Sequence, residues 1–267
     1  MKTILITGAS TGIGKAIGEH LTSIGHRVFG TSRNPAQYPD STFELLILDV
    51  RDSKSIQAAM ATILQKTERI DVLINNAGVG IAGALEEVPE SEIKNNFEVN
   101  FFGPIAVMKA VLPTMRSQKS GLIINITSIA GYMGLPFRGA YSASKSALSI
   151  LSEAIAMEVK PFGIHVCCVA PGDFATNIAA GRFHAPLIGG SDYESGYQKT
   201  LVLMNTHVDS ADDPMAMALE IEKIIDTKNP KLHYKVGSFL QKFSVILKFV
   251  LPDLVYQKML MKHYGLA

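Results

Sequence analysis

The stretch TILITGASTGIG, residues 3–14, sets the architecture of this chain. It opens with an apolar run at 3–7 that is rich in β-branched residues, which is typical of a buried strand. A glycine-rich turn follows, and GKAIGEHLTSIG (14–25) then has the spacing of a helix. A buried strand, a tight turn and a helix in this order form the first half of a βαβ unit.

The same alternation continues along the chain. Further strands are predicted at 26–32, 43–50, 71–78, 121–128 and 163–172, and further helices at 53–67, 91–117, 141–161 and 214–226. We expect an irregularity in the helix 91–117, because Pro104 lies inside it. Strands that are apolar throughout and alternate with helices indicate a doubly wound, Rossmann-type α/β fold with a parallel sheet, here as one domain over 1–267.

Composition narrows the class of protein. The chain has 267 residues, of which 47% are hydrophobic, and a net charge of +1, so nucleic-acid binding has no bulk electrostatic support. Cys167 and Cys168 are adjacent in an apolar run, which predicts buried thiols and a reducing compartment. We expect a cytoplasmic protein, since no signal peptide and no run of 18 apolar residues is present. No metal site is expected, because His184 and His207 are isolated.

Polar, glycine-rich segments follow five of the predicted strands. They are TGASTGIG, TSRNP, NNAG, TSIAG and APGDFAT. Because the carboxyl ends of parallel strands meet at one edge of a sheet, these segments should line one crevice, where ligands of doubly wound sheets bind. In the first segment, Gly8, Gly12 and Gly14 allow tight turns beside a helix N-terminus, a combination that suits a pyrophosphate.

The segment YSASK, residues 141–145, places Tyr141 and Lys145 four residues apart, and therefore on one face of the helix. In one interpretation, the pair lies on a solvated helix face and has no function. A lysine cation close to a tyrosine, however, favours the phenolate form, which suits general acid–base chemistry near neutral pH. The second interpretation predicts Tyr141 as a proton donor and acceptor.

Taken in order, these motifs resemble those of the short-chain dehydrogenase/reductase family. TGASTGIG has the family pattern T-G-x-x-x-G-x-G, NNAG (75–78) matches the second motif, and YSASK matches Y-x-x-x-K. Ser128, in NITSIAG, precedes Tyr141 by 13 positions, the usual separation in the family. The resemblance spans about residues 3–176, and the extended tail is similar to that of hydroxysteroid and retinol dehydrogenases.

The resemblance implies a nicotinamide cofactor and assigns roles to individual residues. Tyr141 would exchange the proton, Lys145 would bind the nicotinamide ribose, Ser128 would hold the substrate oxygen, and Asn100, in EVNFFG, would hold a water for proton resupply. Cofactor contacts are expected from Gly8, Ser10, Thr11, Gly12, Ile13, Gly14, Ser32, Arg33, Asp49, Val50, Asn76, Ala77, Gly78, Tyr141, Lys145, Pro171, Gly172 and Thr176.

The end of the second predicted strand favours NADP(H) over NAD(H). An NAD-binding protein places a carboxylate there, where it hydrogen-bonds the ribose 2′-hydroxyl. Here Ser32 stands at that place with Arg33 beside it, and no Asp or Glu occurs from 21 to 39. The guanidinium of an arginine binds a phosphate through two parallel hydrogen bonds, so Arg33 is the expected anchor of the 2′-phosphate.

The last third of the chain should select the substrate. Residues 177–215 are expected to form a lid, and residues 237–267 a helical tail. Residues 231–267 contain six lysines and one aspartate, so they carry +5 and the rest of the chain carries −4. Two interpretations of the tail stay open: its apolar residues cover the substrate pocket or a subunit interface, or they touch an anionic membrane surface peripherally.

The sequence therefore predicts an NADP-dependent oxidoreductase, EC 1.1.1.-, that interconverts a ketone or aldehyde and an alcohol. The substrate would be hydrophobic, similar to a steroid, a retinoid or a keto-lipid. By resemblance, the helices 91–117 and 141–161 would form a homodimer or homotetramer. The alternative is a catalytically silent member of the family that acts as a nucleotide-binding sensor.

Overall fold

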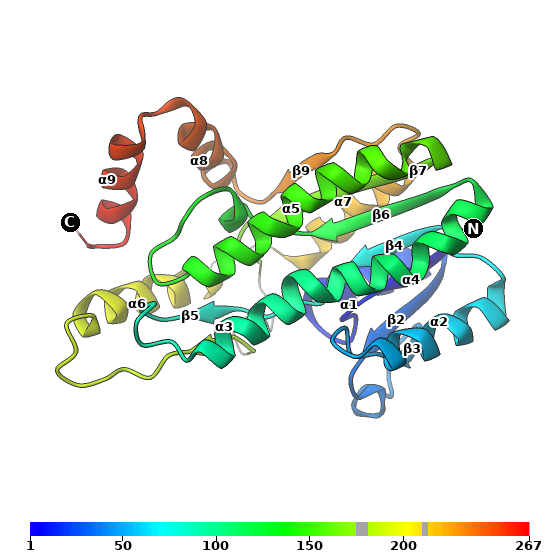
Figure 1. Cartoon of the computed structure of the whole chain (residues 1–267), viewed down its shortest axis with the longest axis horizontal. Coiled ribbons are helices and arrows are strands. Elements are labelled where there is room, and N and C mark those ends of the chain that lie inside the picture. Colours follow the sequence, from blue (N-terminus) through cyan, green and yellow to red (C-terminus); the bar gives the residue numbers. More distant parts are fainter. Residues whose placement is uncertain (175–180, 210–212, 267) are drawn as a thin grey trace.

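A seven-stranded parallel sheet forms the centre of the computed structural model, which describes residues 1–174, 181–209 and 213–266 (Figure 1). The strand order is β3-β2-β1-β4-β6-β7-β9. The strands are β1 (Thr3–Ile6), β2 (Arg27–Ser32), β3 (Glu44–Ile47), β4 (Val72–Asn75), β6 (Gly121–Ile126), β7 (Ile164–Pro171) and β9 (His233–Val236). The chain reverses its winding between β1 and β4, so a ligand crevice is expected outside the carboxyl ends of these two strands.

Helices cover both faces of the sheet. The helices are α1 (Gly12–Ser23), α2 (Ser53–Thr67), α3 (Glu90–Phe97), α4 (Gly103–Gln118), α5 (Gly139–Val159), α6 (Glu194–Asp209), α7 (Pro214–Asp226), α8 (Phe239–Val250) and α9 (Asp253–His263). Figure 1 shows α4 and α5 crossing one face, with α1 and α7 on the opposite face. No helix among the described residues has the length and apolarity that a membrane crossing requires.

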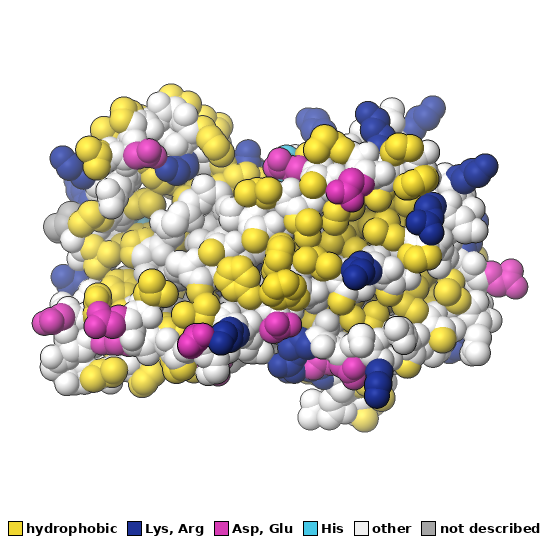
Figure 2. Space-filling model, viewed as in Figure 1, with side chains coloured by type: hydrophobic (Ala, Val, Ile, Leu, Met, Phe, Trp, Pro, Cys, Tyr) yellow, Lys and Arg dark blue, Asp and Glu magenta, His cyan; other side chains and the backbone are white. Residues whose placement is uncertain are grey.

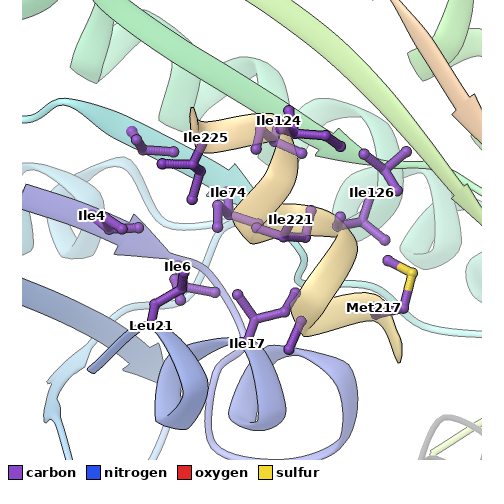
Figure 3. Packing of buried hydrophobic residues seen from close by; sticks show 14 of the residues in the cluster. Ile4, Ile6, Ile17, Leu21, Ile74, Ile124, Ile126, Met217, Ile221 and Ile225 are labelled. Carbon is purple, nitrogen blue, oxygen red and sulfur yellow. The ribbon is translucent and has the colours of Figure 1, made fainter. Parts of the chain in front are cut away.

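The core consists of two layers, one on each side of the sheet, because successive strand residues point to opposite faces. Ile4 and Ile6 pack toward α1 and α7, where they meet Ile17 and Ile221 (Figure 3). Leu5, between them, faces the layer under α2, α4 and α5. Both faces of β1 are therefore buried, which explains its continuous apolar sequence and confirms the predicted doubly wound fold.

The predicted helix at 91–117 is interrupted just before Pro104, as expected. A single π-helical turn, Glu98–Phe102, separates α3 from α4. Pro104 has no N–H, so it cannot donate to the carbonyl of Asn100 four residues earlier, and a wider turn accommodates the missing bond. The interruption places Asn100 at the irregular point of a long helix, where its side chain turns inward and is fully buried.

Other expectations need correction. The serine at the start of the predicted helix 53–67 was the expected cap of that helix. The helix α2 does begin at Ser53, but Asp52 caps it by accepting a hydrogen bond from the Lys54 amide. The strand predicted at 43–50 is shorter, since β3 ends at Ile47. Sequence reasoning missed β9 at the sheet edge and also a short two-stranded ribbon formed by β5 (Ile81–Ala82) and β8 (Phe183–His184). This ribbon joins the region after β4 to the segment that was expected to form a lid.

Candidate active site

The turns that follow β1 and β4 are bonded to each other at the crevice. The Thr7 hydroxyl accepts hydrogen bonds from the amides of Asn76 and Ala77, both at 3.0 Å. The Asn76 side chain donates in return to the carbonyls of Thr7 and Gly8, at 3.0 and 2.9 Å. The two motifs TGASTGIG and NNAG, which are far apart in the sequence, therefore form one rigid wall.

Two glycines of the first turn are required by its backbone. Gly8 and Gly12 have φ values of +64° and +56°, a conformation that L side chains rarely adopt. A Cβ at Gly8 would also lie 2.9 Å from the Ala77 Cα. Gly14, in the first turn of α1, packs against the Asn76 side chain instead of facing the crevice. The turn thus leaves room for a ligand at the N-terminus of α1.

The crevice contains a cavity of about 560 Å³. Most of the residues that were predicted to contact a cofactor line it. They are Gly8, Ser10, Thr11, Gly12, Ile13, Ser32, Arg33, Asp49, Val50, Asn76, Ala77 and Gly78. The structure therefore brings together residues from the ends of β1, β2, β3 and β4, as expected for one binding crevice.

The outer end of this cavity is positively charged. Arg33 is exposed there, and the hydroxyl of the buried Ser32 accepts from the amide of Asn34 at 3.2 Å. Asp49 is the single carboxylate among the described residues of the lining. Arg51 binds it through three hydrogen bonds, the shortest at 2.6 Å, and these bonds lower the pKa of Asp49. This carboxylate is thus already paired.

Lys145 lies on the inward face of α5, and its side chain is buried. Its ammonium donates to the carbonyl of Ile126, the last residue of β6, at 2.9 Å. Burial lowers the pKa of Lys145 from 10.5 to about 8. A Cβ at Gly78 would lie 3.3 Å from this ammonium, so Lys145 reaches the inner wall of the cavity.

Asn100 lies beside the same glycine. A Cβ at Gly78 would lie 3.2 Å from its Oδ1. The Asn100 side chain accepts from the Val79 amide and donates to the Val79 carbonyl, both at 2.9 Å. It donates as well to the Ser144 hydroxyl, which in turn donates to Asn96 Oδ1 at 2.8 Å. The network links the π-helical turn to α5 immediately before Lys145.

Tyr141 packs against the turn that Ser128 caps. Tyr141 packs in one cluster with Ile81 of β5 and with Ala130, which belongs to the 3-10 turn Ile129–Tyr132. Ser128 caps that turn, and its hydroxyl accepts from the Ala130 amide at 3.1 Å. This bond uses a lone pair of the hydroxyl and leaves its proton to donate elsewhere. Tyr141, Lys145, Ser128 and Asn100 thus gather at the carboxyl ends of β4 and β6.

Two arginines beside Tyr141 were missed by sequence reasoning. The Arg138 guanidinium lies over the Tyr141 ring, 5.3 Å from its centroid. Arg182 packs on Gly80, and burial together with the Arg138 cation lowers the pKa of Arg182. Within the described part of the chain, Arg182 Nη1 is buried without a hydrogen-bond partner. Arg138 is the N-cap residue of α5, three positions before Tyr141, so its approach is local, whereas Arg182 directly precedes β8 and its approach depends on the β5–β8 ribbon.

The remaining predicted contacts lie at the end of β7. The amide of Gly172, directly after Pro171, donates to the Val236 carbonyl of β9 at 2.8 Å. The Gln241 side chain of α8 covers Gly172. Thr176 lies outside the described residues. Across those residues, no group of three or more His, Cys, Asp or Glu side chains is placed to hold a metal ion.

Comparisons with known proteins agree with this geometry. The family model for short chain dehydrogenase matches residues 2–186. The chain is 43% identical over 264 residues to a protein of Bacteroides thetaiotaomicron named 3-ketodihydrosphingosine reductase, and the match covers 98% of each chain.

Two solved structures extend the comparison. A short-chain dehydrogenase from Streptomyces avermitilis is 34% identical, with a TM-score of 0.81, over 99% of this chain and 96% of that chain. A metagenomic short-chain oxidoreductase in complex with NADP is 28% identical, with a TM-score of 0.68, over 88% of this chain and 96% of that chain. The family model covers more than half of the sequence, so this chain belongs to the short-chain dehydrogenase/reductase family of oxidoreductases.

Proposed function

We propose that this chain is an NADP(H)-dependent oxidoreductase that interconverts a hydrophobic ketone or aldehyde and its alcohol, with Tyr141 as general acid and base. One observation carries the proposal: Lys145 and Asn100 are both buried against Gly78. Gly78 belongs to the cavity wall, and Lys145 lies one helical turn from Tyr141. The proposed proton donor therefore adjoins the proposed cofactor cavity.

The cavity fits a dinucleotide. The backbone at Gly8 and Gly12 leaves free space at the N-terminus of α1, where amide groups and the helix dipole favour a pyrophosphate. The exposed Arg33 and the pairing of Asp49 with Arg51 favour an additional phosphate on the adenosine side, hence NADP(H) over NAD(H). The similar metagenomic oxidoreductase is described in complex with NADP.

Replacement of Arg33 tests this cofactor preference. The wild-type enzyme should have a higher kcat/KM with NADPH than with NADH. Arg33→Asp should reduce kcat/KM with NADPH by about 10- to 100-fold, the range for a charge-assisted phosphate contact, and should affect NADH less. Arg27→Gln, an exposed arginine at the start of the same strand, serves as the control. A wild-type preference for NADH would contradict the assignment.

The chemistry divides between cofactor and protein. The bound nicotinamide would supply or accept the hydride. The Tyr141 hydroxyl would give a proton to the carbonyl oxygen during reduction, and the Ser128 hydroxyl would hold that oxygen. Lys145, with a pKa of about 8, carries a positive charge at neutral pH and would favour the phenolate that remains. Asn100 would keep the Gly78–Val79 wall in place beside this ammonium.

The surroundings of Tyr141 support a hydrophobic substrate with a polar end. Apolar residues from three segments pack around the tyrosine, namely Ile81, Leu135 and Phe183. Arg182 adds a buried N–H group without a partner in the described structure, which suits an oxygen acceptor of the substrate. The name of the relative from Bacteroides thetaiotaomicron refers to a long-chain keto-lipid. We therefore propose a long-chain keto-lipid as the substrate, with the described residues of the predicted lid, 181–209 and 213–215, covering it; residues 177–180 and 210–212 of that prediction lie outside the described part of the chain.

A second copy of the chain is the proposed partner for the face formed by α4 and α5. Figure 2 shows hydrophobic side chains gathered between these helices. Ile150 and Met157 are 64% and 71% exposed there. Since monomers rarely expose such patches without function, a homodimer or homotetramer is expected. The buried free thiols of Cys167 and Cys168 suit a reducing compartment, and we propose the cytoplasm.

A substrate panel tests the proposed activity. Loss of NADPH absorbance would be followed with 3-ketodihydrosphingosine, steroid ketones, retinal and small ketones. We expect turnover of at least one long-chain or polycyclic ketone and much less with acetone-sized ketones. If wild-type protein binds NADPH but is inactive with the whole panel, the catalytically silent sensor becomes the better description.

A further inference from the structure

The helices α8 and α9 have an outer face that no part of the described chain covers. Phe239, Leu240 and Phe249 are 73%, 76% and 75% exposed. Phe239, Phe243, Ile246 and Val250 recur at the spacing of one helix face, and the Phe239 and Phe243 rings stack 5.7 Å apart. The exposed apolar residues of α9 are Leu254, Val255 and Met259. We call the exposed apolar residues of these two helices together the outer tail face.

The opposite side of the same helices is firmly packed. Val245 and Tyr256 are buried in a cluster with Ile129 and Met133, which follow Ser128. The Tyr256 hydroxyl donates to the Met133 sulfur at 2.9 Å. Because the inner side is buried in this way, the outer tail face cannot turn inward without breaking the cluster.

Gln241 fixes the start of α8 to the site. Its side chain donates to Asp173 at 2.9 Å and accepts from the Ser238 amide at 3.2 Å. Asp173 directly follows Gly172, which Gln241 covers. The outer tail face is thus connected to the turn after β7, which holds Pro171 and Gly172, two of the expected cofactor contacts.

These helices carry a net positive charge. From 239 to 263 there are four lysines, Lys242, Lys248, Lys258 and Lys262, and one acid, Asp253. Asp253 is already paired with Lys248 at 2.8 Å. Figure 2 shows lysine and hydrophobic side chains next to each other on this lobe, at its upper left. An apolar face beside lysines fits a surface that offers hydrocarbon and negative charge together.

We propose that the outer tail face docks on an anionic phospholipid bilayer. The phenyl and leucyl groups would enter the boundary between headgroups and acyl chains, and the lysines would lie at the phosphates. A bilayer matches this face better than a second copy of the chain. Residues 1–230 carry a net charge of −4, but several of their acids are already paired, as Asp49 is with Arg51, Glu44 with Lys66 and Asp71 with Arg69. Docking would hold the active site at the membrane, where the keto-lipid substrate dissolves. This benefit, unlike the docking itself, rests on the proposed function.

Vesicle co-sedimentation tests the proposal without any measurement of turnover. Full-length protein would be mixed with vesicles of equal parts phosphatidylcholine and phosphatidylglycerol, and with vesicles of phosphatidylcholine alone. The test variant is Phe239→Ser with Phe249→Ser. The matched control is Met215→Ser with Leu219→Ser, two exposed apolar residues four positions apart on α7. Circular dichroism and light scattering would report the fold and the oligomeric state of each protein.

We expect wild type and control to sediment with the anionic vesicles, and the test variant to bind at least about tenfold more weakly. Lys242→Gln should weaken binding by about fivefold, and added salt should weaken it further. The proposal is overturned if wild type stays in the supernatant with anionic vesicles or if the test variant binds as well as the control. It is also overturned if the test variant changes the oligomeric mass but not the sedimentation, which would assign the face to self-association.

Discussion

The cavity after β1 and the outer tail face are both open to solvent, but they differ in how their surfaces are built. The cavity wall consists of backbone turns that hydrogen-bond to each other, as between Thr7 and Asn76, and its polar groups point inward. The outer tail face presents large apolar side chains and lysines. The comparison shows that the two kinds of site are recognised by different features. A small-ligand site is recognised by the hydrogen bonds that shape its wall, whereas a docking surface for a large partner is recognised by apolar side chains that the rest of the protein leaves exposed.

Loss of the Tyr141 hydroxyl should have the largest effect. Tyr141→Phe keeps the ring that packs against Ile81 and Ala130 but removes the proton. We expect kcat to fall by about 10²- to 10⁴-fold, the usual contribution of general acid–base catalysis, with NADPH affinity unchanged. Steady-state kinetics and cofactor fluorescence titration measure the two quantities. An active Tyr141→Phe enzyme would exclude this tyrosine as the acid and base.

The buried ammonium of Lys145 should make stability depend on pH. Its pKa is lowered to about 8 in the folded protein and is 10.5 in the unfolded chain. Between these values the unfolded chain binds more protons, so the contribution of Lys145 to stability rises with pH, by about 3 kcal/mol in total. Denaturant unfolding of wild type and of Lys145→Met, both without cofactor and over a range of pH, measures this contribution of Lys145 to stability.

The difference in free energy of unfolding between wild type and Lys145→Met isolates the contribution of the Lys145 ammonium from that of other titrating groups. Burial raises the pKa of Cys167 to about 12, which makes stability fall above pH 9, but this effect is common to both proteins. The free energy of unfolding of wild type minus that of Lys145→Met should therefore increase from pH 8 to pH 10.5. Parallel curves would show that Lys145 is accessible to water.

The hydrogen-bond network of Asn96, Asn100 and Ser144 behind the cavity wall should contribute less to stability than the change expected for Lys145. Asn96 donates to the Val79 carbonyl at 2.9 Å and accepts from Ser144. Asn96→Ala leaves buried partners unsatisfied and should lower the free energy of unfolding by about 1–3 kcal/mol. The control is Asn95→Ala, whose exposed bond with Arg51 should matter by less than about 0.5 kcal/mol. Equal effects of the two variants would contradict the proposed role of the network.

The two faces of α8 should respond differently to the same small change. Val245 is buried against the body, and Val250 is exposed. Val245→Ala should lower the free energy of unfolding by about 1.5–2.5 kcal/mol, since two methyl groups lose burial. Val250→Ala should change it by less than about 0.5 kcal/mol. Thermal or denaturant unfolding compares the two variants, and a large effect at Val250 would mean that this face is covered.

The sequence was sufficient for most of the fold, because buried parallel strands have an unmistakable apolar pattern. The bounds of α2 and α7 agree with the ranges read from the sequence, since a cap or a proline marks an end of each. The edge strand β9 was missed because His233 and Tyr234 are only partly buried and Lys235 is exposed, so the strand lacks that pattern. Edge strands need less apolar surface than central ones.

The site was predictable only where its residues form motifs. The spacing of Asn96 and Asn100, one helical turn apart, could have indicated the network, and Arg138 stands only three residues before Tyr141. Arg182 and Gln241 reach the site through tertiary contacts that no local pattern records. The roles of the motif residues themselves stay predictions until the variants above are measured.

Transfer of a labelled hydride tests the proposed reaction most directly. NADPH with deuterium at both C4 positions would be incubated with the wild-type protein and a long-chain ketone such as 3-ketodihydrosphingosine, and the alcohol would be analysed by mass spectrometry. We predict an alcohol with one deuterium on the carbinol carbon, and almost none with Tyr141→Phe. An unlabelled alcohol, or no alcohol from any ketone of the panel, would contradict the proposal.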